Sequence, residues 1–562
     1  MTSGSAAVSG AETARVRVSS NAAARRPGWS IARFIVVSSC VDSEVRPIVT
    51  PSARLCEPEP SFALLQCSEA DTQNAERRLN RDGPDRLEEF PMPVPIPPLR
   101  EENLPERKLS FWQLAGPGAI MIGLAIGAGE LAVWPWVTAK FGAVMIWAAA
   151  LGVFLQLWIN IEIGRWAVVT GEHPYTSYAR MSMGVIYAFL SLGFVGLFLP
   201  GWARMSGAAL KALFFGPDGP GPEWFWTAVT FGLIALILFG PKQMYKAVER
   251  AIGIMVLVIT IGLIYVAFSV GTWDAIKEMG RGLVNFGHIE LDDQFTFARF
   301  FGAVVFAGIG GAGNLWYAFY LRDKNIGMGG RIPVLANPLR VHETAEVQTG
   351  FRYHETPENA SRFRRWMRYV IQDQVIFFWL GNTFTMFLFM FGALTVLRPA
   401  GIVPEEGQIV WDMSVILETS LGTPGRYVFL LIGMAALFSS QLGAVDGGAR
   451  TWSYLLGSMF KFGQKRTQSQ WYLTFAIMFM VAGTVSTAFF ELSGVSALGF
   501  IFNSALLGGF AMAIYVPLTL YVNLTKLPKS ARPKALNIVM MLIASAVYVS
   551  FTLFTIWGLI FG

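Results

Sequence analysis

Residue types that build metal and disulfide sites are scarce in this chain of 562 residues. All three cysteines, Cys40, Cys56 and Cys67, precede the first long apolar segment, and the whole sequence has only four histidines. This excludes a disulfide framework, a zinc site of the Cys/His type and a histidine-rich metal site. Motifs for phosphate-binding loops and catalytic triads are also missing, so the sequence predicts neither an enzyme nor a bound cofactor.

Charged residues are scarce as well. They make up 15% of the chain, whereas 53% of it is hydrophobic, and the mean hydropathy is +0.47. This composition excludes an ordinary water-soluble globule and predicts a polytopic protein of the lipid bilayer. The net charge of +6 comes from Lys and Arg between apolar segments, which indicates orientation in a membrane and not nucleic-acid binding. Nothing in the sequence indicates an oligomeric state.

The chain is predicted to have two parts. Residues 1–107 are rich in Ser, Ala, Arg and Pro, and contain no apolar run long enough to cross a bilayer. They are expected to form a disordered cytoplasmic tail, ending in an extended linker over 91–98, or to precede the true start of translation. Residues 108–562 are expected to form the transmembrane domain.

About eleven apolar segments follow Leu109, each near the roughly 20 residues that cross hydrocarbon. They are centred near Ile126, Leu155, Phe194, Leu233, Val258, Phe306, Phe384, Leu437, Phe479, Leu507 and Tyr548. Lys and Arg dominate alternate connections between the segments, and acidic residues dominate the others. We expect the protein to lie in the cell (inner) membrane. The positive-inside rule predicts that its N-terminus is cytoplasmic and, after an odd number of spans, that Gly562 is outside.

Two of these segments are interrupted by a similar motif. The first contains Gly127-Ala128-Gly129-Glu130, and the sixth contains Gly311-Ala312-Gly313-Asn314. Interrupted helices at matching positions of two halves indicate a transporter binding site. We therefore expect an all-α fold with a 5+5 inverted repeat, in which helices 1 and 6 are broken. The repeats cover about 112–270 and 296–522, and 535–561 forms an extra helix.

The predicted substrate site combines the side chains of Glu130 and Asn314 with backbone carbonyls freed near Gly127 and Gly311. A carboxylate within a span is functional by default, as a cation ligand or a proton carrier, although Glu130 also suits a helix cap and the glycines also suit close helix packing. Further ligands are sought among the polar residues of later spans, namely Gln441, Asn503 and Asp446. The first two are equally suited to hydrogen bonds between helices. Asp446 stands four residues before Arg450, which favours a structural pair or a gate.

Motifs along the chain resemble those of the NRAMP family of divalent-metal transporters, which have the LeuT-type fold. They are Gly116-Pro117-Gly118, Thr170-Gly171-Glu172, Gly207-Ala208-Ala209-Leu210, and Tyr245 with Glu249 and Arg250. The resemblance runs from about Gly116 to the end of the chain. It implies alternating-access transport of a divalent cation through eleven spans.

The interrupted helices depart from the family. The family's Asp-Pro-Gly-Asn is replaced by residues 127–130, and its Met-Pro-His-Asn is replaced by residues 311–314. Loss of the thioether ligand weakens the expectation of iron or manganese selectivity. An acidic pair in the third span, associated with proton movement, is replaced by Gly201 and Arg204. One carboxylate is kept, because Glu130 lies about one helical turn from position 127.

The expected function is therefore secondary active transport of a divalent cation of the Mn/Fe or Mg class. The alternative is transport of a small organic solute such as an amino acid, for which the small glycines would leave room.

Overall fold

The computed structural model describes residues 93–106, 116–241, 244–335, 337, 339, 350–494 and 496–561. Most of the predicted tail, residues 1–92 and 107, lies outside the described residues, and so do the three cysteines. Apart from two short strands, the regular structure of the described chain is helical. The prediction of an all-α membrane protein is confirmed.

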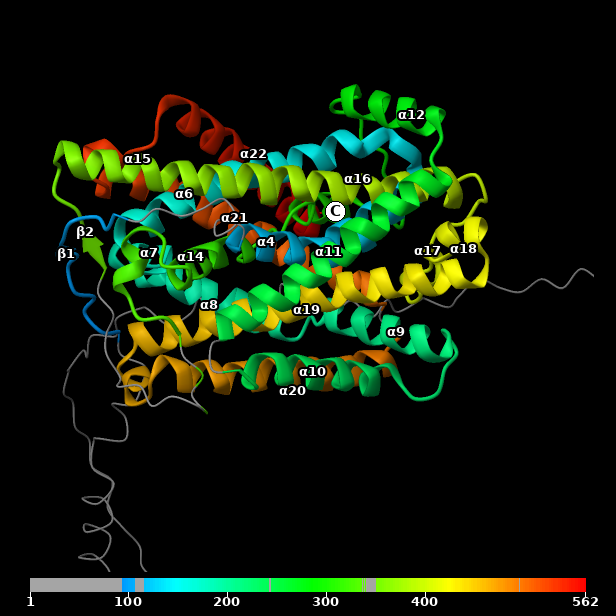
Figure 1. Cartoon of the computed structure of the whole chain (residues 1–562), viewed down its shortest axis with the longest axis horizontal. Coiled ribbons are helices and arrows are strands. Elements are labelled where there is room, and N and C mark those ends of the chain that lie inside the picture. The colour runs from blue at the N-terminus through cyan, green and yellow to red at the C-terminus, as the bar shows by residue number, and fades with distance from the viewer. Residues whose placement is uncertain are drawn as a thin grey trace, which may run out of the picture. The chain divides into compact units, whose positions relative to one another are not determined.

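Helices occupy the predicted spans (Figure 1). Within the described residues, eight helical stretches are long and apolar enough to cross a membrane, and one of them, Pro117–Thr170, has 54 residues and is long enough to cross twice. In chain order the helices are α4 (Pro117–Ala125), η3 (Ile126–Val133), α5 (Trp134–Phe141), α6 (Ile146–Thr170), α8 (Met183–Leu197), α9 (Gly201–Phe215), α10 (Glu223–Phe239), α11 (Met244–Val270), α13 (Phe297–Val305), α14 (Gly313–Asp323), α15 (Pro357–Gln372), η6 (Asp373–Gly381), α16 (Asn382–Gly392), η7 (Ala393–Leu397), α19 (Thr423–Met459), α20 (Gln468–Leu492), α21 (Ala497–Lys526) and α22 (Ala535–Phe561). The predicted centres all lie inside these helices except Phe306, which lies between α13 and α14.

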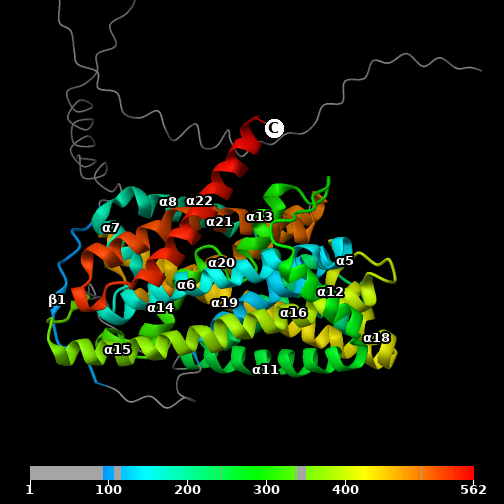
Figure 2. The same ribbon diagram turned by 90° about the horizontal axis from the view of Figure 1, so that it is seen from above.

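The connections between the spans gather at two ends of the helical domain (Figures 1 and 2). One end carries β1 (Arg100–Glu101), β2 (Phe351–Arg352) and α7 (Pro174–Met181), and the other carries α12 (Trp273–Val284), α17 (Ile409–Met413) and α18 (Val415–Leu421). Lys and Arg predominate in the connections of the first end, and acidic residues predominate in those of the second. The predicted orientation requires this separation of charge; which end faces the cytoplasm stays a prediction.

The sixth span is interrupted as predicted. α13 ends at Val305 and α14 begins at Gly313, and between them Gly310 and Gly311 have φ angles of +62° and +55°. Residues with a side chain rarely adopt this left-handed backbone, whereas glycine adopts it readily. The two glycines therefore allow the chain to turn inside the bundle.

The first span is not broken, contrary to the prediction. It continues through Gly127 and Gly129 as a π-helical segment, η3, whose wider turn displaces backbone groups without unwinding the helix. Neighbouring α19 bonds several of these groups: the Gly127 N–H donates to Ser440 Oγ at 3.0 Å, and the hydroxyls of Ser439 and Ser440 donate to the carbonyls of Gly123 and Leu124 at 2.7 Å each. These two serines therefore bond backbone groups at the start of the π-helical segment.

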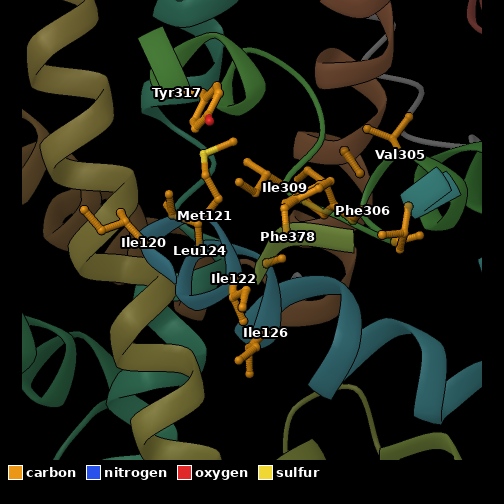
Figure 3. Close-up of a cluster of buried hydrophobic side chains, with 14 of the residues drawn as sticks. Ile120, Met121, Ile122, Leu124, Ile126, Val305, Phe306, Ile309, Tyr317 and Phe378 are labelled. Carbon is orange, nitrogen blue, oxygen red and sulfur yellow. The ribbon is translucent and has the colours of Figure 1, made fainter. Parts of the chain in front are cut away.

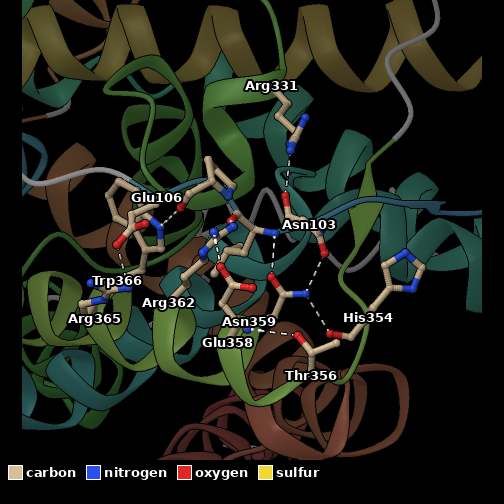
Figure 4. A network of polar contacts seen from close by, with 12 residues as sticks. Asn103, Glu106, Arg331, His354, Thr356, Glu358, Asn359, Arg362, Arg365 and Trp366 are labelled. Carbon is tan, nitrogen blue, oxygen red and sulfur yellow. Dashed lines mark hydrogen bonds and ion pairs between the residues drawn. The ribbon is translucent and has the colours of Figure 1, made fainter.

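Residues 93–106 fall within the predicted tail, but they pack against the helical domain (Figure 4). β1 pairs in parallel with β2, and Leu104 is fully buried. The Leu104 N–H donates to Asn359 Oδ1, its carbonyl accepts from Arg362, and the Trp366 indole donates to the Pro105 carbonyl. An extended backbone lacks internal hydrogen bonds and is ordered here by these partners on α15. Residues 93–106, on the N-terminal side of the predicted boundary at residue 108, thus pack on the helical domain.

Candidate functional site

A cavity of about 220 Å³ adjoins the interruption of the sixth span. Residues 308–313 form one of its walls, and most of the remaining lining comes from α8, α9, α19, α20 and α21, with single residues from α4, α7, α10 and α14. Its aromatic lining comprises Tyr175, Phe189, Trp202, Phe231, Phe306, Trp316, Trp452 and Phe479. Among the described residues that line it, none is Asp, Glu, Lys, Arg or His. The cavity is therefore suited to a solute that brings no net charge.

Side chains from two other spans hold the interrupted segment in place. On α6, Gln156 donates from its amide nitrogen to the Val305 carbonyl and accepts from the Gly310 N–H, each at 2.9 Å. On α21, the Tyr515 hydroxyl donates to the Gly311 carbonyl at 2.8 Å. Backbone groups that a regular helix would pair are thus bonded to neighbouring helices, as burial in hydrocarbon requires.

Replacing Gln156 tests this arrangement. Gln156→Leu keeps a similar size but leaves the Val305 carbonyl and the Gly310 N–H without these partners. Two such losses are expected to lower the free energy of unfolding by about 2–3 kcal/mol. Thermal unfolding of the detergent-purified variant measures the loss. The matched control is Gln372→Leu on the exposed face of α15, for which a change within about 0.5 kcal/mol is expected. Equal stability of the two variants would contradict the role given to Gln156.

The first span packs directly against the interruption. Figure 3 shows its side chains from Ile120 to Ile126 gathered beside Phe306, Ile309 and Phe378. At Gly129 the approach is so close that an added Cβ would lie 1.4 Å from the Phe306 carbonyl oxygen. η3 therefore supports the cavity wall from behind, and only glycine fits at that contact.

Glu130 is fully buried, but it is not among the residues that line the cavity. Its Oε2 lies 2.5 Å from the hydroxyl oxygen of Thr385 on α16. Its Oε1 has no hydrogen-bond partner within the described part of the chain. The carboxyl group therefore faces the seventh span.

Of the other three residues of the central prediction, Asn314 and Gly311 meet at the Tyr515 hydroxyl, whereas Gly127 packs on a different helix. Asn314 is buried and donates from its amide nitrogen to the Tyr515 hydroxyl at 3.2 Å. Gly127 packs on α19, where an added Cβ would lie 2.6 Å from the Ala436 carbonyl oxygen. Gly311 lines the cavity, but its carbonyl is already bonded to Tyr515. The structure thus does not assemble the predicted ligand set around one point.

The additional predicted residues have different surroundings. Gln441 lines the cavity; its amide nitrogen donates to Thr230 Oγ at 3.0 Å, and its Oε1 has no partner among the described residues. Asn503 lies on the exposed face of α21 and does not line the cavity. Of this group, only Gln441 lines the cavity, and its Oε1 is buried without a hydrogen-bond partner among the described residues.

Asp446 forms the predicted pair with Arg450, at 2.9 Å. The structure extends the pair, because Arg450 also contacts Asp323 on α14 at 2.5 Å, and Tyr472 on α20 donates to Asp446 at 2.7 Å. Arg450 and both carboxylates are buried. This network joins three helices and contains no residue of the cavity lining.

No group of three or more His, Cys, Asp or Glu suited to a metal ion occurs in the described ranges. The sequence analysis also missed Gln156, Tyr515 and Thr385, which hold the interruption and Glu130. For Gln156 a signal was present: it adjoins the predicted centre of the second span, where an amide requires a partner.

No known protein family matches the sequence, and no curated protein matches it either. Several solved structures resemble the fold of the chain. A substituted form of the manganese transporter of Eremococcus coleocola is 15% identical, covers 82% of this chain and 90% of its own, and superposes with a TM-score of 0.56. The same transporter in complex with an aromatic bis-isothiourea compound is 15% identical, covers 81% and 89%, and has a TM-score of 0.56. MhsT in complex with L-phenylalanine is 16% identical, covers 81% and 100%, and has a TM-score of 0.49.

The similarity to the manganese transporter confirms the LeuT-type fold that the NRAMP resemblance implies. The chain therefore shares its fold with that transporter. At 15% identity the similarity concerns the fold and does not extend to the transported substrate.

Proposed function

We propose that the protein is a secondary transporter of a small organic solute without net charge, of the amino-acid class. The observation that carries the proposal is the cavity beside the interrupted sixth span, whose described lining contains no ionisable acid or base. Substrate sites of such transporters lie at discontinuous helices, and the two repeats rock around them. At about 220 Å³ the cavity is smaller than the roughly 300–1,000 Å³ of drug-sized pockets, which favours a small solute.

The polar atoms of the cavity suit the two ends of a zwitterion. Gln441 Oε1 is a buried acceptor without a partner, and an ammonium group would donate to it. α14 begins at Gly313 against the cavity, and the positive end of its helix dipole favours a carboxylate. The aromatic lining would enclose an apolar side group.

A divalent cation is the competing substrate, because a manganese transporter has the same fold and because Glu130 is a buried carboxyl group. Two observations weigh against it. A doubly charged ion in the cavity would meet no carboxylate from the described lining, and uncompensated charge is costly in a low-dielectric site. The Glu130 carboxyl group, in turn, contacts Thr385 on the seventh span.

Isothermal titration of the purified protein tests the assignment of Gln441. Gln441→Leu removes the acceptor for the ammonium group, which is worth about 1.5–3 kcal/mol, or roughly 10- to 150-fold in Kd. We expect this weakening for the neutral amino acid that binds the unmodified protein best. The control is Thr230→Val, which removes the other partner of Gln441 and keeps its Oε1; its Kd is expected to change less than threefold. An unchanged Kd in Gln441→Leu would remove this residue from the site.

A further inference from the structure

The Glu130 carboxyl group has few hydrogen-bond donors. It is fully buried, one of its oxygens has no partner among the described residues, and the other meets only the Thr385 hydroxyl. An ionised carboxylate accepts several hydrogen bonds and is costly to bury when they are missing. The surroundings therefore suit a neutral group better than a charged one.

The Thr385 hydroxyl carries a single proton but lies near three acceptors. Its oxygen is 2.5 Å from Glu130 Oε2, 3.0 Å from the Gly381 carbonyl and 3.3 Å from the Asn382 carbonyl. Threonine within a helix commonly donates to the carbonyl four residues earlier, which here is that of Gly381. When the Thr385 proton is used in this bond to Gly381, the short contact between Thr385 and Glu130 needs a proton on the Glu130 carboxyl group. Protonated Glu130 then donates to the Thr385 hydroxyl, and that hydroxyl donates to the Gly381 carbonyl.

Lys140, Arg426 and Arg450 on the packed elements are paired with other carboxylates, and Lys526 is exposed at the last residue of α21. Neither α4 nor α16 contains an ionisable residue, and η3 contains only Glu130. On α5, Lys140 pairs with Asp292 at 2.6 Å. The ionisable residues of α19 and α21 are Arg426, Tyr427, Asp446, Arg450, Tyr454, Tyr515, Tyr521 and Lys526. Arg426 pairs with Glu418 and Arg450 with two aspartates, so neither arginine neutralises Glu130.

We propose that Glu130 binds a proton in this conformation, and that this proton locks the first span to the seventh through Thr385. The proton enters from water, adds to the carboxylate without any other bond breaking, and returns to water when the two spans part. This site is separate from the substrate cavity, and its effect on transport rests on the proposed function.

The lock acts on the cavity through one residue. Gly129 precedes Glu130 and packs on the carbonyl of Phe306, a residue of the cavity lining. Any movement of η3 away from α16 therefore also moves the support of the cavity wall. Parting of the first and seventh spans would thus combine proton release with a change at the substrate site.

Infrared difference spectroscopy tests the bound proton without reference to any solute. The spectrum of the purified protein at neutral pH, minus that of Glu130→Gln, is expected to show the carbonyl stretch of one protonated carboxyl group. Glu130→Gln is isosteric and keeps a hydrogen bond to Thr385, and its thermal unfolding is checked against the unmodified protein. A difference spectrum with only the bands of an ionised carboxylate would overturn the proposal.

Exchange of amino acids across proteoliposome membranes tests the lock. In the unmodified protein, exchange is expected to slow as the pH falls, because more of the protein holds the proton. Glu130→Gln mimics the protonated form, so its exchange is expected to be slow and independent of pH, whereas Glu290→Gln, at a partly exposed carboxylate, keeps the normal profile. A normal pH profile in Glu130→Gln would overturn the lock. If the unmodified protein exchanged no amino acid, the proposed function would fail, and the infrared result would still decide whether Glu130 holds a proton.

Discussion

Gly129→Ala is expected to reduce transport strongly. An added Cβ would lie 1.4 Å from the Phe306 carbonyl oxygen, which belongs to the backbone of the cavity wall and is not a flexible side-chain end. The first span would have to move away from the sixth, or the wall would have to collapse into the cavity, and overpacking of this kind costs about 1–3 kcal/mol or more. Uptake by proteoliposomes at equal protein content measures the effect, for which we expect a loss of at least about tenfold.

The control for this variant is Gly232→Ala. Gly232 lies on α10, where an added Cβ would meet nothing within 4 Å, and alanine favours the helix by about 1 kcal/mol. Its transport is expected to be unchanged. If both variants transported at the normal rate, the close contact between the first span and the interruption would not be required for function.

The second large effect is expected at Arg450. Arg450→Met removes the only described cation that contacts both Asp323 and Asp446, and leaves two buried carboxylates without it. Breaking a buried ion pair from one side costs about 3–5 kcal/mol, because the remaining charge is uncompensated. We expect a marked fall of the unfolding temperature in detergent. The measurement is made at neutral pH, so that acid unfolding does not contribute to the fall.

An exposed pair supplies the comparison for Arg450. Lys277 and Asp274 on α12 lie 3.3 Å apart with side chains 65% and 95% exposed, and such pairs contribute at most about 1 kcal/mol. Lys277→Met is therefore expected to leave the unfolding temperature nearly unchanged. Rescue of Arg450→Met by adding Asp323→Asn and Asp446→Asn would support the electrostatic cause. A small effect of Arg450→Met alone would contradict it.

The spans were predictable because hydrocarbon leaves few alternatives to helices. Lipid requires internally bonded backbone and about 20 apolar residues per crossing, so hydropathy alone locates the helices. The interruption of the sixth span was predictable too, since Gly310 and Gly311 adopt a backbone that favours glycine. These features depend on local sequence, and the structure reproduces them.

The first span shows the limit of local reasoning. Its glycines resemble those of the sixth span, yet Ser439 and Ser440 on α19, distant in the sequence, bond its displaced groups and keep it helical. The π-helical segment also changes the direction in which the Glu130 side chain points. The prediction that Glu130 shares a face with position 127 assumed 3.6 residues per turn, whereas a π turn takes more than four. Glu130 consequently contacts the seventh span.

The site itself was predictable only in part. The sequence named Gly311 and Gln441 among its candidate residues, and both line the cavity beside the interruption; their role in binding stays a prediction. It did not reveal that Gln156 and Tyr515 would bond the interrupted backbone, since a single polar residue in a span does not identify its partner.

Uptake by proteoliposomes containing the full chain tests the central claim most directly. The panel compares radiolabelled neutral amino acids with Mn²⁺, Fe²⁺ and Mg²⁺ under the same gradients, with protein-free liposomes as the blank. We predict saturable uptake of at least one neutral amino acid, no uptake of the three cations above the blank, and loss of that amino-acid uptake in Gly129→Ala. Saturable cation uptake without any uptake of amino acids would contradict the account and restore the divalent cation as the substrate.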